Sequence, residues 1–162
     1  MFKNKHFIVA LLVAPVLSIL AYLGTDLALS EKPHAAKKGE AYKLLSKSNC
    51  RYTSGLCDME NGEFKIQFRS ESVTKEHLLL TLSSKLPLQG IKLSLVEDLQ
   101  DSGTPLDMQR LDDSDRKWTL TLPAPTSDEN WLRVAAQAND TYYYGDTQTI
   151  FVTYETLLNK EQ

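Results

Sequence analysis

Apolar and polar residues alternate in one segment after another between residues 64 and 154. The segments are 64–68, 78–82, 91–95, 118–122, 132–136 and 150–154. This period of two is typical of a strand that buries one face. Turn-forming sequences such as "PLQG" at 87–90 and "YGD" at 144–146 separate the segments, and no sustained helical period lies between them. The pattern predicts an all-β domain over residues 44–156, an antiparallel β-sandwich resembling the immunoglobulin class.

The N-terminus carries an export signal. Lys3 and Lys5 precede an uncharged apolar run from Phe7 to Leu23. We expect a transmembrane helix over residues 7–23, with residues 1–6 in the cytoplasm, because lysines stay on the cytoplasmic side of a first span. The lipid bilayer is then the first partner of the chain. The small residues of "ALS" at 28–30 keep a second interpretation open, a signal peptide cleaved near Ser30.

The remaining chain divides by composition and charge. Residues 24–43 are polar and show no sustained period, which predicts a stalk, and residues 157–162 form a C-terminal tail. Residues 44–162 hold twelve basic and eighteen acidic residues, a net charge of about −6. Because such a domain repels phosphate backbones, we expect no nucleic-acid partner.

A hairpin follows the second cysteine. Asn61 and Gly62 form a dipeptide suited to a two-residue turn, since both residues tolerate positive φ. A turn centred on them predicts the cross-strand pairs Glu60–Glu63, Met59–Phe64, Asp58–Lys65 and Cys57–Ile66. In this register Cys57 and Met59 share the inner face with the apolar residues of 64–68.

Cys50 and Cys57 are the two cysteines of the chain. The segment between them contains Ser54 and Gly55, which allow the chain to reverse. In an oxidising compartment this pair is expected to close as a structural disulfide. A redox pair usually has CxxC spacing at a helix start, and a zinc or copper site needs further ligands nearby. We therefore favour a structural cross-link over a reactive or metal-binding pair.

Side chains suited to catalysis are sparse. The predicted domain has one histidine, His77, which shares the outward phase of its strand. The sequence has neither a GxSxG motif nor a glycine-rich phosphate loop, so we expect no enzyme and no cofactor. Met108 and His77 are the only weak candidates for a metal site.

Aromatic residues near the C-terminus are candidates for partner binding. Trp131 precedes the sequence "TYYYGD", which contains Tyr142, Tyr143 and Tyr144. Tyrosines anchor protein partners, but they also pack the corners of sandwiches. Because successive strand residues point to opposite faces, at least one of the three is expected to be exposed.

The order of these motifs resembles a known arrangement. A short N-terminal anchor, "CRYTSGLC" at 50–57, "DMENGEFKIQF" at 58–68 and "RKWTLTLP" at 116–123 resemble uncharacterised single-pass bacterial envelope proteins with a CxxxxGxC motif and an immunoglobulin-like domain. The chain is also loosely similar to FixH-like periplasmic domains. The resemblance implies a bacterial inner-membrane protein with its C-terminal domain in the periplasm. Two hypotheses for the function follow from the residues and the resemblance together: a non-catalytic interaction or accessory role with another envelope protein, or alternatively metal handling during assembly of a respiratory or copper enzyme.

Overall fold

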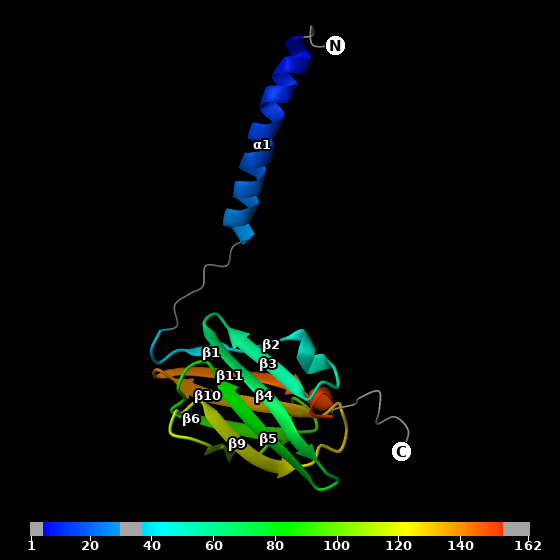
Figure 1. The fold of residues 1–162 in the computed structure, drawn as a ribbon, viewed down its shortest axis with the longest axis vertical. Helices are drawn as coiled ribbons and strands as arrows, with labels where there is room; N and C mark the ends of the chain where they lie inside the picture. Colours follow the sequence, from blue (N-terminus) through cyan, green and yellow to red (C-terminus); the bar gives the residue numbers. More distant parts are fainter. Residues whose placement is uncertain (1–4, 30–36, 154–162) are drawn as a thin grey trace. The chain divides into compact units, whose positions relative to one another are not determined.

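The computed structural model describes residues 5–29 and 37–153, which belong to two separate units, an N-terminal helix and a β-domain (Figure 1). Helix α1 (Lys5–Leu29) has 25 residues, so it is about 37 Å long and exceeds the ~30 Å hydrocarbon core of a bilayer. Its span Ile8–Thr25 has a mean hydropathy of 2.3. The helix is therefore long and apolar enough to cross a membrane.

Helix α1 extends beyond the expected span at both ends and continues into the residues expected to form the stalk. The hydroxyl groups of Ser18 and Thr25 bond to the backbone of the helix itself: Ser18 donates to the carbonyl of Ala14 at 2.9 Å, and Thr25 donates to that of Ala21 at 3.0 Å. Such bonds satisfy polar groups in an apolar medium. Ser30 and the tail at 157–162 lie outside the described residues.

The β-domain consists of two sheets. Sheet A holds, in spatial order, β1 (Ala41–Lys43), β11 (Thr141–Gln148), β10 (Trp131–Ala138), β6 (Gly90–Val96) and β7 (Leu106–Asp107). Sheet B holds β2 (Leu45–Ser46), β3 (Leu56–Asn61), β4 (Phe64–Val73), β5 (His77–Ser84), β9 (Lys117–Pro123) and β8 (Gln109–Arg110). Two short 3₁₀ helices, η1 (Ser48–Arg51) and η2 (Thr149–Val152), complete it. All pairs are antiparallel except β1 with β11.

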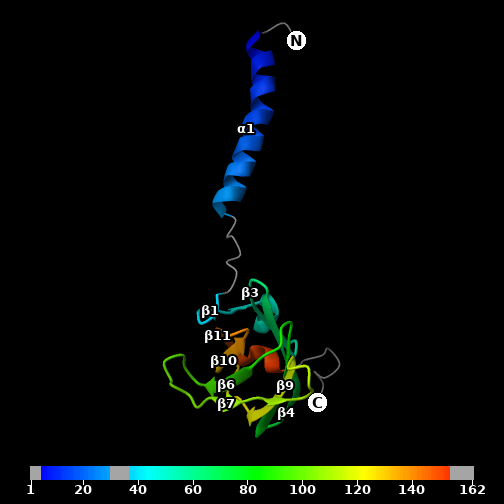
Figure 2. The same cartoon turned by 90° about the vertical axis from the view of Figure 1, so that its left-hand side faces the viewer.

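The core lies between the two sheets, which Figure 2 shows from the side. Inward residues of β4, β5 and β10 are buried as their alternation predicts; examples are Phe64, Phe68, Leu80 and Leu132. Five of the six expected strands are present, and the predicted all-β sandwich after an N-terminal helix is confirmed. Leu95 and Leu120 are only partly buried although their phase is inward.

The sixth expected strand, at 150–154, is wrong. Residues Thr149–Val152 form η2, and Tyr154 lies outside the described residues. The last strand within residues 37–153 is β11, which runs through the expected "YGD" turn. The inward residues of β11 are Thr141, Tyr143, Gly145 and Thr147. Because two threonines and a glycine supply little apolar character, the period of two is hidden there.

The β3–β4 hairpin has a different register from the one expected. Asn61 pairs with Phe64, so the two-residue loop is Gly62–Glu63, and Gly62 has φ 56°. A turn with positive φ at its first central position matches the type that favours glycine there. The shift moves each partner by two residues, so Cys57 now faces Phe68 and every side chain keeps its predicted face.

The new register removes the like-charge pair expected at the turn. Glu60 lies opposite Lys65, and their side chains form an ion pair at 3.2 Å. Glu63 instead pairs with Lys85 at 2.9 Å. Electrostatics between neighbouring strands therefore favour the observed register over the expected one.

Both long edges of the sandwich are closed by a segment that changes sheets. On one edge β1 belongs to sheet A and β2 to sheet B, with Leu44 between them; on the other, Met108 lies between β7 and β8. Leu44 is 1% exposed and Met108 is 4% exposed. Strand β1 also lies inside the segment expected to be stalk, so the folded domain begins before the expected boundary at residue 44.

Candidate functional site

The hairpin between β10 and β11 decides where the tyrosines point. Asn139 and Asp140 have φ values of 51° and 60°, as a two-residue type I′ turn requires. This turn pairs Ala138 with Thr141, and both are buried. Tyr142 and Tyr144 must therefore point outward.

Tyr143 is a core residue, not a partner-binding one. It is 5% exposed, and its ring stacks on that of Phe64 with centroids 3.8 Å apart and planes 8° apart. Burial raises the pKa of its hydroxyl above the usual value. The expected role in partner binding is wrong for this tyrosine, because the pleat of β11 turns it between the sheets.

Tyr142 and Tyr144 stand on the outer face of sheet A and are 51% and 48% exposed. Tyr142 lies between Ala41 and Gln137 on the neighbouring strands, and Tyr144 lies between Lys43 and Ala135. The two alanines are too small to cover the rings. We call this surface, formed by Ala41, Lys43, Ala135, Gln137, Tyr142 and Tyr144, the tyrosine face.

Trp131 shares this outer face but lies at the far end of β10, opposite Gln148 of β11 and Val96 of β6. It is half-buried. The loop after β6 folds onto this end, since Arg133 donates hydrogen bonds to the carbonyls of Leu99 and Asp101. Trp131 therefore borders a covered region, whereas the tyrosine face is open.

The outer face of sheet B offers a contrast, because its polar side chains bond to one another. Gln67 donates to Asp58 at 2.8 Å, and Thr81 donates to Glu71 at 2.7 Å. Within residues 5–29 and 37–153, the side chain of Lys43 and the hydroxyls of Tyr142 and Tyr144 make no hydrogen bond or ion pair. The open donors and rings of the tyrosine face are thus available to a partner.

Cys50 and Cys57 form the predicted disulfide, with Cα atoms 4.2 Å apart. The cysteines are 1% and 0% exposed. Because the pair is oxidised and buried, it resembles a structural cross-link more than a redox centre.

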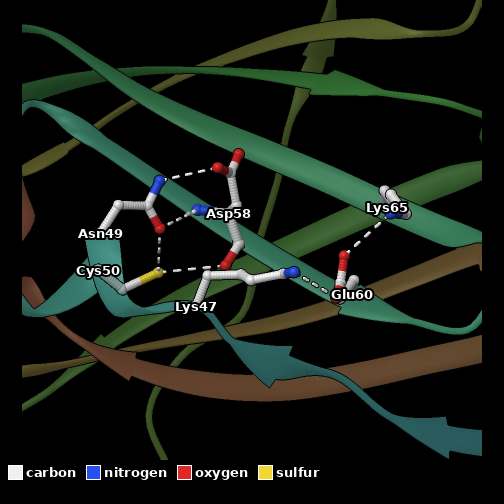
Figure 3. Close-up of polar contacts among 6 residues, drawn as sticks. All are labelled: Lys47, Asn49, Cys50, Asp58, Glu60 and Lys65. Atoms are coloured by element: carbon white, nitrogen blue, oxygen red, sulfur yellow. Dashed lines mark hydrogen bonds and ion pairs between the residues drawn. The ribbon is translucent and has the colours of Figure 1, made fainter.

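The loop that carries Cys50 is held to β3 by polar contacts (Figure 3). The Nδ2 of Asn49 donates a hydrogen bond to the carboxylate of Asp58 at 2.8 Å. Its Oδ1 accepts a hydrogen bond from the backbone N–H of Asp58 at 3.2 Å. Cys50 Sγ lies 3.3 Å from the carbonyl oxygen of Asp58, a contact without a proton because the sulfur is in the disulfide. Lys47 and Lys65 pair with Glu60 at 2.6 and 3.2 Å and lower its pKa.

The two metal candidates do not come together. Met108 directly precedes β8, and β8 pairs with Trp118 and Thr119 at the start of β9. His77 lies opposite Pro123 at the other end of β9. Four or five strand residues separate these positions, or about 15 Å. His77 is exposed, with its Nε2 3.8 Å from Glu76. In the described part of the chain, no group of three or more His, Cys, Asp or Glu residues could hold a metal ion.

One sequence signal could have located β11. The dipeptide Asn139–Asp140 tolerates positive φ at both positions and follows an alternating strand, which is typical of a hairpin.

Comparison of the chain with protein-family models, with curated proteins and with solved structures finds no match. The resemblance to envelope proteins and FixH-like domains stays a prediction.

Proposed function

We propose that this protein is a membrane-tethered, non-catalytic interaction protein of the bacterial envelope, whose β-domain binds another envelope protein through the tyrosine face. The observation that carries the proposal is the exposure of Tyr142 and Tyr144 side by side on one strand face, flanked by alanines. Tyrosine is enriched in the cores of protein interfaces, because its ring gives apolar contact and its hydroxyl can bond.

The topology we propose has α1 in the inner membrane and the β-domain in the periplasm. Lys3 and Lys5 precede the helix, and lysines favour the cytoplasmic side. The buried disulfide supports an oxidising compartment for the domain. A tether of this kind confines the tyrosine face near the membrane, where a second envelope protein would meet it at high effective concentration.

The chemistry of the tyrosine face favours a partner with a flat, partly apolar surface that offers hydrogen-bond acceptors. The two rings project from a sheet and not from a cleft, so they suit a protein surface better than a small molecule. Lys43, which forms no ion pair with any described residue, adds a positive charge at one side. We expect a carboxylate or backbone carbonyls of the partner opposite it.

Site-specific photocrosslinking in native membranes tests this function. A photoreactive residue at Ala135, between Tyr144 and Lys92 on sheet A, should give a discrete crosslinked protein. The same residue at Ser83, exposed on the outer face of sheet B, is the matched control and should give none.

Replacing both exposed tyrosines with serine should remove the crosslink formed from Ala135. The melting temperature of the domain should change little, since neither side chain is buried. Equal crosslinking from Ala135 and Ser83, or a crosslink that survives loss of both tyrosines, would contradict the proposal.

A further inference from the structure

A cleft of about 460 Å³ opens between the sheets beside the last residues of β6 and β9. Its walls are mainly apolar and include Leu95, Val96, Leu106, Leu122, Pro123 and Ala124. The cleft exists because the closing strands are short: β7 pairs only with Lys92 and Leu93 of β6, and β8 pairs only with Trp118 and Thr119 of β9. Its volume is within the range of binding pockets.

Among residues 5–29 and 37–153, no partner pairs with part of the strand edge of β9 beside the cleft. Lys117 accepts a hydrogen bond from Leu111 on the β8 side, and Ala124 donates to Glu76 on the β5 side. Since backbone groups alternate along a strand, the N–H and C=O of Thr121 point to the side where β8 has already ended. An exposed edge of this kind pairs readily with an extended chain. Pro123 limits the edge to this short stretch, because it has no N–H.

Asn130 places an oriented amide in the lining of the cleft. Asn130 lines the cleft and is 5% exposed. Its Oδ1 accepts hydrogen bonds from Thr126 Oγ1 at 3.1 Å and from the N–H of Ser127 at 2.9 Å, which fixes the amide orientation. Among the described residues its Nδ2 has no partner. A ligand that brings a carbonyl oxygen would satisfy this donor.

Acidic residues occur in the lining of the cleft, at Glu97, and in the two loops that contribute to it. The loops 97–105 and 124–130 border it, and their charged residues are Glu97, Asp98, Asp101, Asp128 and Glu129. The nearby guanidinium of Arg133 bonds to carbonyls of the first loop. Glu97 lines the cleft and makes no ion pair within the described ranges. This charge repels free fatty acids and other anions and attracts basic groups.

From these four observations we propose that the cleft binds a short extended segment of another polypeptide, with an apolar side chain flanked by basic residues. The apolar side chain enters between Leu106 and Leu122. A peptide carbonyl accepts a hydrogen bond from Asn130 Nδ2, the backbone pairs beside Thr121, and the basic flanks face the acidic loops. The site is distinct from the tyrosine face, which lies on the outside of sheet A, so each can be tested alone.

The test uses the full chain in nanodiscs of phosphatidylcholine, a lipid without net charge. The probe is the acetylated and amidated peptide Lys-Val-Leu-Val-Lys, followed by NMR with ¹⁵N-labelled asparagine. We expect saturable binding with a dissociation constant below about 1 mM, and a downfield shift of the Asn130 side-chain amide protons as they gain an acceptor. The peptide Glu-Val-Leu-Val-Glu should bind at least roughly tenfold more weakly, because its charges repel the acidic residues beside the cleft.

Two variants locate the binding. Ala124→Trp places a large side chain in the cleft and should weaken binding roughly tenfold or more. Glu97→Gln should weaken it about two- to fivefold, with less effect at high salt. Ser83→Trp introduces the same side chain on the outer face of sheet B and should leave the affinity unchanged; thermal unfolding of each variant verifies that it is folded.

Several results would overturn the proposal. These are the absence of saturable binding, equal affinity for the acidic peptide, full affinity in a folded Ala124→Trp variant, and an Asn130 amide that does not shift. Stronger binding of decanoic acid than of the basic peptide, at the same cleft, would also overturn it by identifying an acyl-chain site. None of these results bears on crosslinking from Ala135.

Discussion

Gly145 of β11 is a position where one methyl group should disturb the closed edge of the sandwich. A Cβ atom at Gly145 would lie 2.8 Å from Met59 Cε, 2.9 Å from Leu44 Cβ and 3.0 Å from the carbonyl oxygen of Leu44. Met59 Cε is the end of a flexible side chain and can move. Leu44 is buried, and its N–H donates to the carbonyl of Tyr144 at 2.6 Å, so it has little freedom.

The expected magnitude comes from two opposing effects. Overpacking a close-packed site costs about 1–3 kcal/mol, whereas replacing glycine by alanine inside a strand gains about 0.5–1 kcal/mol. From the middle of each range, Gly145→Ala should lower the free energy of unfolding by about 1 kcal/mol. Gly90→Ala is the matched control, because Gly90 is in β6 and a Cβ there meets nothing within 4 Å. It should be neutral or stabilising by up to about 1 kcal/mol.

Urea unfolding of the full chain in detergent micelles measures this difference. The fluorescence of the two tryptophans, buried Trp118 and half-buried Trp131, reports unfolding of the β-domain. The midpoint of Gly145→Ala should fall and that of Gly90→Ala should not, with the same slope for both. If the two variants are equally stable, Leu44 can move away without a loss of stability. That result would refute the argument that β1, Leu44 and β2 form a rigid edge of the sandwich.

Four further predictions concern other parts of the chain. Replacing Cys50 and Cys57 with serine should lower the free energy of unfolding by about 2–4 kcal/mol in urea, and thiol reagents should label the native protein only after denaturation and reduction. Met108→Ala should cost about 2–5 kcal/mol and Met108→Leu less than about 1.5 kcal/mol, while Cu(I) titration shows no stoichiometric site in either the parent or the leucine variant. Hydrogen bonds from Lys47 and Lys65 hold the pKa of Glu60 below its ordinary value, so its ionised form stabilises the fold above the ordinary carboxyl pKa. That stability is lost as the pH falls through the lower folded pKa, and circular dichroism should show Glu60→Gln to be less sensitive to acid than the parent. A reporter fused after Gln162 should be active only outside the cytoplasm, with the chain retained in carbonate-washed membranes; a soluble form starting near residue 31 would instead indicate a cleaved signal peptide.

The sequence by itself determined the features that depend on local pattern. A long apolar helix, five strands with one buried face, and a cross-link between Cys50 and Cys57 all follow from composition, period and spacing. In the β3–β4 hairpin, the sequence also predicted correctly which face of the sheet each residue occupies, although it predicted the wrong cross-strand partner for each. A slip of two residues preserves the side-chain period, so the inner face remains apolar in either register.

Tertiary structure decided the features that depend on distant neighbours. In sequence Gly145 looks like a turn residue and Tyr143 like a candidate for partner binding. They become core residues only because Phe64, Met59 and Leu44 pack against them. Met108 becomes a buried edge residue because the chain changes sheets there. The tyrosine face and the cleft likewise depend on which strands pair and where the short edge strands end. Local periodicity carries no information on those long-range pairings, because they are fixed by packing between segments far apart in the chain.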